Sequence, residues 1–128
     1  METTLGQYLE GRTAKGFRPV PHYFRDGDFV SFFFSNDRCF AQRVDELLTV
    51  YLSETTGQMV GCKIKGVRLL LKTLKAFALS IEDDEVRLDW LFLSAGYLSS
   101  TSEKGYYEIL RERVKDAKVP LNGLAAAA

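Results

Sequence analysis

The sequence predicts a single α+β domain in which a curved antiparallel meander of five or six strands packs against one main helix, with short terminal helices. Three observations predict this fold. Residues 47–64 read as two apolar strands around a turn at Gly57, and residues 67–78 carry apolar side chains at helical spacing. The connections between the predicted strands are too short for crossover helices, which favours an antiparallel sheet.

Composition limits the size and charge of the molecule. A chain of 128 residues with 46% hydrophobic residues is one domain's worth of globular sequence. Basic and acidic side chains number 17 each, so no net field attracts nucleic acid or an anionic membrane. We assign residues 1–124 to the domain, because the alanines at 125–128 resemble an expression-vector remnant.

The N-terminal segment predicts a short helix followed by extended chain. Thr4 and Gln7 fit a capping box, and Gly11 ends the helix. Such a short helix must pack on the rest of the domain to be stable. Pro19 and Pro21 then force extended backbone.

Residues 22–25 and 28–35 predict a hairpin around Asp26-Gly27, because Asp-Gly supplies the positive φ that a type I′ turn needs. The second strand is apolar on both faces, with Val30, Phe32 and Phe34 on one and Phe29 and Phe33 on the other. A strand with one wet face alternates apolar and polar residues. We therefore expect both faces of this strand to be covered.

Three further strands and the main helix follow. Residues 39–44, 47–53 and 58–64 predict strands joined by short turns. The main helix is predicted over residues 67–78, with apolar positions at Val67, Leu70, Leu71, Leu74, Phe77 and Ala78.

The last third of the chain is less regular. Residues 81–85 form an acidic loop, and the alternation of apolar side chains over residues 86–93 predicts a further strand, with a helix as the alternative. Residues 94–99 are expected to be irregular.

A second capping box at Ser100 predicts a helix over residues 100–115, with Tyr107, Leu110 and Val114 as its apolar stripe. Pro120 and Asn122-Gly123 are expected to end the ordered structure.

The segment 45–66 resembles the hairpin of the DUF2283 family of small bacterial proteins. That family repeats a turn glycine, two apolar residues, a glycine, any residue, an acidic residue and an isoleucine; the matching positions here are Gly57, Met59, Val60, Gly61 and Ile64. Lys63 stands at the acidic position, and Thr55 and Thr56 replace the expected aspartates. The composition also resembles products of mobile integron gene cassettes. Neither resemblance implies a known activity or a site residue.

The residue types that carry catalysis and metal binding are sparse. His22 is the only histidine, so it has no second histidine with which to share a metal site. Cys62 alternates with Val60 and Ile64, which is typical of a core thiol, and Cys39 also lies on a predicted strand. The acidic run 82–85 lacks the spacing of a calcium loop. We predict no catalytic residue, metal or cofactor.

Four cations form the sharper feature of the sequence. Lys65, Arg68, Lys72 and Lys75 are spaced by three, four and three residues and fall on one face of the main helix. Such a row can bind an acidic protein, a small anion or nucleic acid. It also does what any amphipathic helix needs, which is to keep the outer face wet.

A group of aromatic residues is the second candidate surface. It comprises Phe29, Phe32, Phe33, Phe34, Tyr51 and Trp90. Burying a phenylalanine is worth roughly 1.5–3 kcal/mol, so these rings are expected to form a subunit interface or to line a pocket.

We therefore expect a cytoplasmic, non-enzymatic homo-oligomeric binding module, with a dimer as the first choice of assembly. Its partner would be an acidic protein or a small anion at the cationic row, and neither nucleic acid nor a membrane is expected. The alternative is a small ligand-binding protein or enzyme with an aromatic-lined pocket between the sheet and the main helix.

Overall fold

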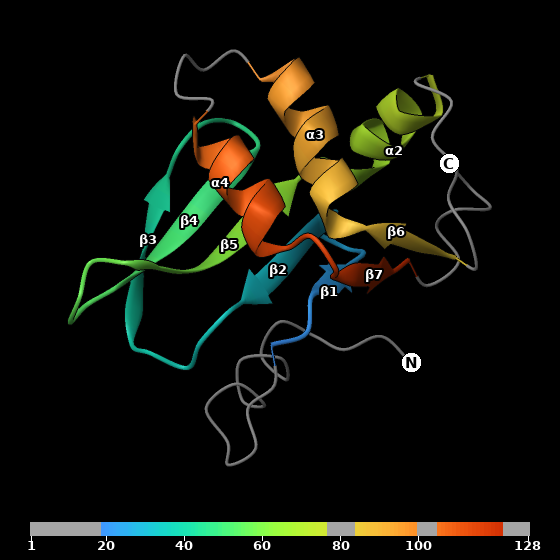
Figure 1. Cartoon of the computed structure of the whole chain (residues 1–128). Helices are drawn as coiled ribbons and strands as arrows, with labels where there is room; N and C mark the ends of the chain where they lie inside the picture. Colours follow the sequence, from blue (N-terminus) through green and yellow to red (C-terminus); the bar gives the residue numbers. More distant parts are fainter. Residues whose placement is uncertain (1–18, 77–83, 100–104, 122–128) are drawn as a thin grey trace.

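The computed structural model describes residues 19–76, 84–99 and 105–121, and these form a mixed α+β fold (Figure 1). A five-stranded antiparallel sheet lies behind a layer of helices. Its strands are β1 (His22–Phe24), β2 (Phe29–Phe33), β3 (Cys39–Arg43), β4 (Leu48–Ser53) and β5 (Met59–Lys65). The predicted class and the antiparallel sheet are confirmed.

The strand order differs from a simple meander. The strands lie in the order β1-β2-β5-β4-β3, so β5 is inserted between β2 and β4. Strands β3, β4 and β5 form a meander, and the β1–β2 hairpin joins it by pairing β2 with β5. The sheet stays open, with β1 and β3 at its edges.

Three helices of the described part lie on one face of the sheet (Figure 1). They are α2 (Val67–Ala76), α3 (Leu88–Leu98) and α4 (Gly105–Arg113). Two short strands, β6 (Glu85–Arg87) and β7 (Lys118–Pro120), pair with each other in a second sheet. The predicted helix at residues 4–11 lies outside the described residues.

The start of α2 is held by the β1–β2 hairpin. The carbonyl oxygen of Asp28 accepts the backbone N–H groups of Gly66 (3.0 Å) and Val67 (3.3 Å). Its carboxylate oxygens accept the N–H of Arg68, both at 3.3 Å, and Oδ1 also accepts the Tyr23 hydroxyl at 2.7 Å. Asp28 therefore supplies the acceptors that a helix N-terminus lacks.

The hairpin turn itself corrects a prediction. The positive φ was expected at Asp26-Gly27, but it falls on Asp28, at 53°. The N–H of Asp28 donates to the carbonyl of Arg25 at 3.2 Å, so the loop is a four-residue turn rather than a two-residue type I′ turn. Aspartate is one of the few residues that adopts this left-handed conformation readily.

The largest difference from the prediction lies at residues 86–99, where the helix that was the alternative for residues 86–93 forms in place of the preferred strand. Only residues 85–87 form a strand, and the predicted strand from Leu88 onward and the expected irregular stretch are both helix α3. Leu88, Leu91, Phe92 and Ala95 are all buried, and their spacing is helical. This helix is buried on most of its surface and therefore carries many apolar residues. Over a short window such residues also alternate as they would in a strand.

The chain end adds a strand that was not predicted. The predicted apolar stripe is confirmed, because Tyr107 and Leu110 of α4 and Val114, which follows the helix, are all buried. Pro120 ends strand β7 and pairs with Glu85. A three-residue edge strand tolerates a terminal proline because one missing N–H costs no central ladder bond.

Both faces of β2 are covered, as predicted. Phe32 faces the helix layer and is 6% exposed, whereas Phe33 faces the other way and is 3% exposed. The Phe33 ring stacks on Tyr51 with centroids 4.7 Å apart, across the small residue Gly61 between them. A Cβ atom at Gly61 would lie 2.7 Å from the Phe33 ring and 2.9 Å from a backbone oxygen, so the stack requires glycine there.

Candidate functional site

The four predicted cations are exposed at the start and along the outer side of helix α2. Arg68, Lys72 and Lys75 lie on α2, whereas Lys65, predicted on the same helix, is the last residue of β5. Lys65, Arg68, Lys72 and Lys75 are all exposed, while Val67, Leu70, Leu71 and Leu74 on the opposite side are buried. We call these four exposed residues the α2 cationic face. The helix sequence contains no acidic residue, so the face has a single sign of charge.

Two further observations describe the α2 cationic face. Ion pairs within the described ranges join Arg38 to Glu54 and Arg87 to Asp89, so Lys65, Arg68 and Lys72 have no carboxylate partner there. Leu69 lies next to Arg68 and is 53% exposed, although leucine is usually buried. The face therefore combines positive charge with one large exposed apolar side chain.

The structure divides the six aromatic residues among three places. Phe32 and Phe34 pack edge to face on the helix side of the sheet, and Phe33 stacks with Tyr51 on the other side. Phe29 stacks on Phe24 there as well.

Trp90 lies on α3, away from these rings, with the Arg87 guanidinium 5.0 Å above its ring. The six residues therefore do not converge on one site. Because Phe32 and Phe33 are buried within one chain and β2 is paired on both sides, covering them does not require a second subunit.

A groove between α3 and α4 is a site that the sequence analysis missed. It consists of two cavities of about 420 and 210 Å³ that share Glu108 and Arg111. The larger is lined by charged side chains, namely Asp89, Glu108, Arg111, Glu112 and Lys115. The smaller is lined mostly by apolar and aromatic residues, namely Phe92, Leu93, Gly96, Tyr97 and Tyr107.

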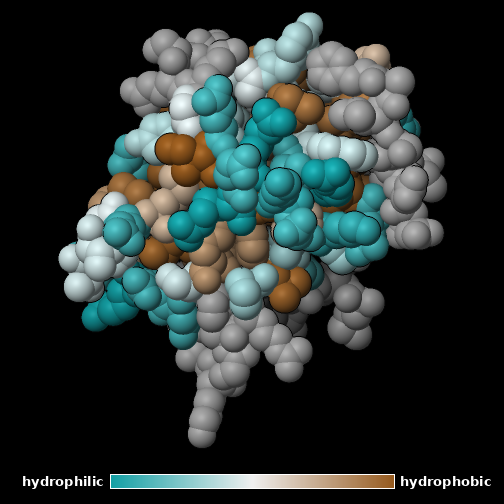
Figure 2. Space-filling view, viewed as in Figure 1, coloured by the Kyte–Doolittle hydropathy of each residue, from teal (hydrophilic) through white to brown (hydrophobic). Residues whose placement is uncertain are grey.

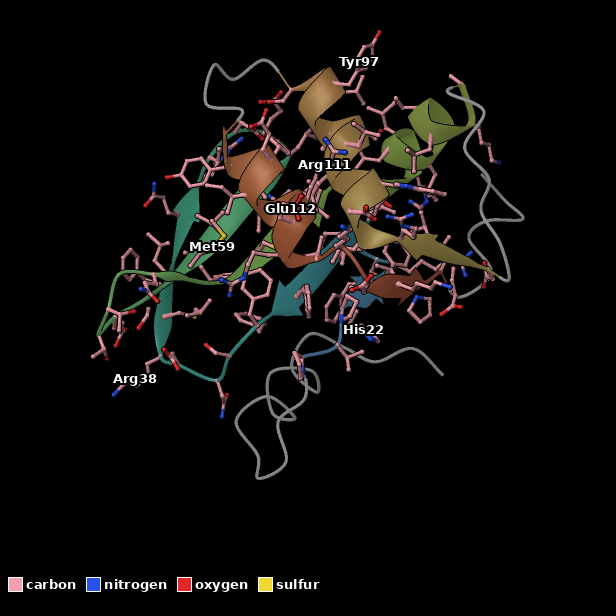
Figure 3. All side chains as sticks on the ribbon, viewed as in Figure 1. His22, Arg38, Met59, Tyr97, Arg111 and Glu112 are labelled. Carbon is pink, nitrogen blue, oxygen red and sulfur yellow. The ribbon has the colours of Figure 1, made fainter. Side chains whose placement is uncertain are left out.

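Most charged side chains of the α3–α4 groove come from α4. Arg111 and Glu112 lie beside the groove and Tyr97 projects at the end of α3 (Figure 3). Glu108, Arg111, Glu112 and Lys115 form no ion pair within 4.0 Å in the part of the chain that the structure describes. Figure 2 shows hydrophilic side chains along the middle of this face, with separate hydrophobic patches around them. No sequence signal revealed the groove, because α3 was read as a strand.

A carboxylate at the β3–β4 turn connects the sheet to both helices of the groove. Oδ1 of Asp45 accepts the N–H groups of Leu47 (2.7 Å) and Leu48 (2.9 Å). Oδ2 accepts the hydroxyls of Ser99 (2.7 Å) and Tyr107 (2.6 Å). We call these residues the Asp45 cluster.

The titration of the Asp45 cluster indicates a structural role. Burial acts to raise the pKa of Asp45, but the hydrogen bonds from Tyr107, Ser99 and the two amides outweigh it and hold the pKa below its ordinary value. Burial and the Asp45 hydrogen bond raise the pKa of Tyr107 well above its usual range. Near neutral pH the carboxylate therefore stays ionised and the phenol stays protonated, which preserves the hydrogen bond between them.

The cysteines and His22 are the remaining candidates for chemistry. Cys62 is 2% exposed, and burial raises the pKa of its thiol, which disfavours the reactive thiolate. Cys39 on β3 and His22 on β1 are half-buried, and neither cysteine is in a disulfide. Within residues 19–76, 84–99 and 105–121 no group of three side chains could hold a metal ion. Glu82 and Asp83 lie outside these residues. No described helix is long and apolar enough to cross a membrane.

Comparisons of this chain with protein-family models, with curated proteins and with solved structures found no match.

Proposed function

We propose that the protein is a non-enzymatic binding module that holds an acidic segment of a partner protein against the α2 cationic face. The observation that carries this proposal is the single sign of charge on α2. An ordinary solvent-facing helix mixes acidic and basic residues, as α4 does with Glu108, Glu112, Arg111 and Arg113. In helix α2, every charged residue is basic.

The choice of an acidic protein over nucleic acid follows from the neighbours of these cations. The large apolar side chain exposed among these cations is Leu69, which suits an apolar contact with a peptide. Readers of single-stranded nucleic acid place aromatic rings between their cations so that bases can stack. Helix α2 (Val67–Ala76) contains no aromatic residue.

The test measures by fluorescence anisotropy, at low salt, how tightly the protein binds a fluorescently labelled peptide of repeating Glu-Glu-Leu units. Changing Arg68, Lys72 and Lys75 together to Glu should weaken binding by roughly tenfold or more, because three attractions become repulsions. The matched control changes Arg111, Lys115 and Lys118 to Glu. This control changes the net charge by the same amount, but at positions outside the α2 cationic face.

Equal loss in both variants, or unchanged binding in the α2 variant, would contradict the proposal. A labelled DNA duplex serves as a second probe. If the duplex binds at the α2 cationic face more tightly than the peptide does, nucleic acid is the partner instead.

A second candidate function rests on the α3–α4 groove. Charges of both signs beside Phe92, Tyr97 and Tyr107 suit a small zwitterion with an aromatic side chain. Calorimetric titration with L-phenylalanine and L-tyrosine tests this candidate. Binding that disappears in Arg111→Ala but persists in Arg25→Ala supports it, and no heat from either amino acid at millimolar concentration rejects it.

A further inference from the structure

Strand β3 is the open edge of the five-stranded sheet. Four of its five residues are exposed, including Phe40 at 49%. At the opposite edge, Tyr23 and Phe24 of β1 are buried. Within the described ranges, β3 pairs with β4 on one side and with no strand on the other (Figure 1). An edge of this kind is a template for pairing with another chain.

The ladder between β3 and β4 determines which backbone groups face outward. The N–H of Val44 donates to Leu48 and the carbonyl of Arg38 accepts from Glu54, both at 2.9 Å. Bonded pairs alternate along an antiparallel ladder, so even-numbered residues of β3 point their backbone groups toward β4. The N–H and C=O of Ala41 and Arg43 therefore point away from the sheet.

Strand β3 carries little of the usual protection of an edge. Natural edge strands carry charged residues, above all lysine, or proline or a bulge that prevents pairing. The sequence of β3 is Cys-Phe-Ala-Gln-Arg, in which the one charged residue is Arg43 at its end, and its register with β4 is regular. The irregularity in this part of the sheet falls between Tyr51 and Leu52, in the β4–β5 ladder.

We propose that two copies of the chain dimerise by antiparallel pairing of β3 with β3, about a two-fold axis at Gln42. This pairing joins the two sheets into one and uses the same surface on both copies, as a two-fold interface requires. Ala41 of each copy forms a hydrogen-bonded pair with Arg43 of the other. The proposal is independent of the partner assigned to α2.

Side chains select this register. With the axis at Gln42, Phe40 lies opposite Val44 of the second copy, and Arg38 lies near its Glu46. Arg38 projects from the body at this end of the molecule (Figure 3), and its side chain is 92% exposed. An axis at Ala41 would instead oppose Arg38 to Val44 and Asp37 to Asp45. The Gln42 register pairs apolar with apolar and opposite charges with each other.

The interface therefore moves from the expected phenylalanine strand to the sheet edge. Strand β2 is paired with β1 and β5, so its backbone cannot accept another strand. The exposed Phe40 of β3 was not among the six aromatic residues that the sequence analysis selected.

The test measures the dimer dissociation constant by analytical ultracentrifugation. Ala41→Pro removes an outward N–H from each copy without touching the β3–β4 ladder, so it should weaken the dimer by roughly tenfold. Phe40→Asp should weaken it as well. The matched control is Ile109→Asp, an equally exposed apolar residue on α4, which should leave the dimer unchanged. Circular dichroism verifies that each variant is folded.

A cross-linking experiment tests the register. In a Cys39→Ser background, Gln42→Cys places two thiols across the axis, where the Cα atoms of a non-bonded pair lie about 4.5 Å apart and a disulfide fits. Gln42→Cys should therefore cross-link under mild oxidation faster than Ala41→Cys. Faster cross-linking of Ala41→Cys, or a wild-type chain that is monomeric at roughly 100 μM, would overturn the proposal.

Discussion

Asp28 and Asp45 fasten opposite sides of the sheet to the helix layer, and they do so unequally. Asp28 joins the β1–β2 hairpin to the start of α2 through carboxylate bonds of 3.3 Å from the Arg68 amide, and it also accepts a 2.7 Å bond from Tyr23 within the hairpin. Asp45 accepts four bonds of 2.6–2.9 Å: two from Leu47 and Leu48 close the β3–β4 turn, and two from Ser99, the C-cap of α3, and Tyr107 of α4 join this turn to the helices.

The difference reflects what else holds each side. Helix α2 packs four buried apolar residues, Val67, Leu70, Leu71 and Leu74, so Asp28 supplements a large apolar contact. On the other side, β3 is largely exposed, and Asp45 brings together residues 54 and 62 positions away in the sequence. We conclude that the Asp45 cluster matters more to the stability of the fold than Asp28 does.

The strongest test of this comparison is Asp45→Ala. It leaves two hydroxyls and two amides without their acceptor, so the free energy of unfolding should fall by about 3 kcal/mol. Urea denaturation followed by circular dichroism measures the change. The control Asp37→Ala, at an exposed position, should change stability by less than about 0.5 kcal/mol. Similar values for the two variants would show that the Asp45 cluster is not a major contact.

The next largest effect is expected for Tyr107→Phe. This change removes a 2.6 Å bond to a carboxylate but keeps the ring that packs against Phe92, so the loss should be about 1.5 kcal/mol. Thermal denaturation of this variant, of Asp45→Ala and of the double variant gives the coupling between the two residues. If the two losses simply add, the bond contributes little.

Asp28→Gly should cost less, about 1 kcal/mol, which is typical for the loss of a helix cap, because glycine also adopts the positive φ of this position. The effect should be local, so amide hydrogen exchange should increase in the first turn of α2 and stay unchanged in α4. A loss as large as that of Asp45→Ala would reverse the comparison.

The smallest effect is a pH dependence. Because the folded-state pKa of Asp45 is depressed, its ionisation stabilises the fold above the unfolded value of about 3.9. This contribution is lost as the pH falls from that value through the lower folded-state pKa. The stability difference between wild type and Asp45→Asn should therefore shrink as the pH is lowered through this range in urea titrations. A constant difference would show that ionisation of Asp45 does not stabilise the fold.

The sequence predicted the first half of this fold well, because local signals and tertiary structure agree there. The strands from β1 to β5 and helix α2 begin and end close to their predicted bounds. Alternation identifies half-covered strands, and Gly57, whose φ is 74°, marks the turn between β4 and β5. Helix α3 was missed because burial on most sides removes the polar stripe that distinguishes a helix from a buried strand.

The candidate sites divide in the same way. The α2 cationic face was predictable, since its residues are three or four apart on one helix. The α3–α4 groove and the Asp45 cluster were not, because each depends on contacts between distant segments. Asp45 lies between two predicted strands, Ser99 in a stretch expected to be irregular and Tyr107 in the apolar stripe of a predicted helix, so nothing in the sequence connected the three.

The burial of Cys62 gives the molecule an internal reporter. This thiol lies on the central strand β5 and is 2% exposed, so a reagent such as dithionitrobenzoate reaches it only when the sheet comes apart. In a Cys39→Ser background, the rate at which Cys62 is modified therefore times the opening of the native protein, without denaturant and without a change to the core.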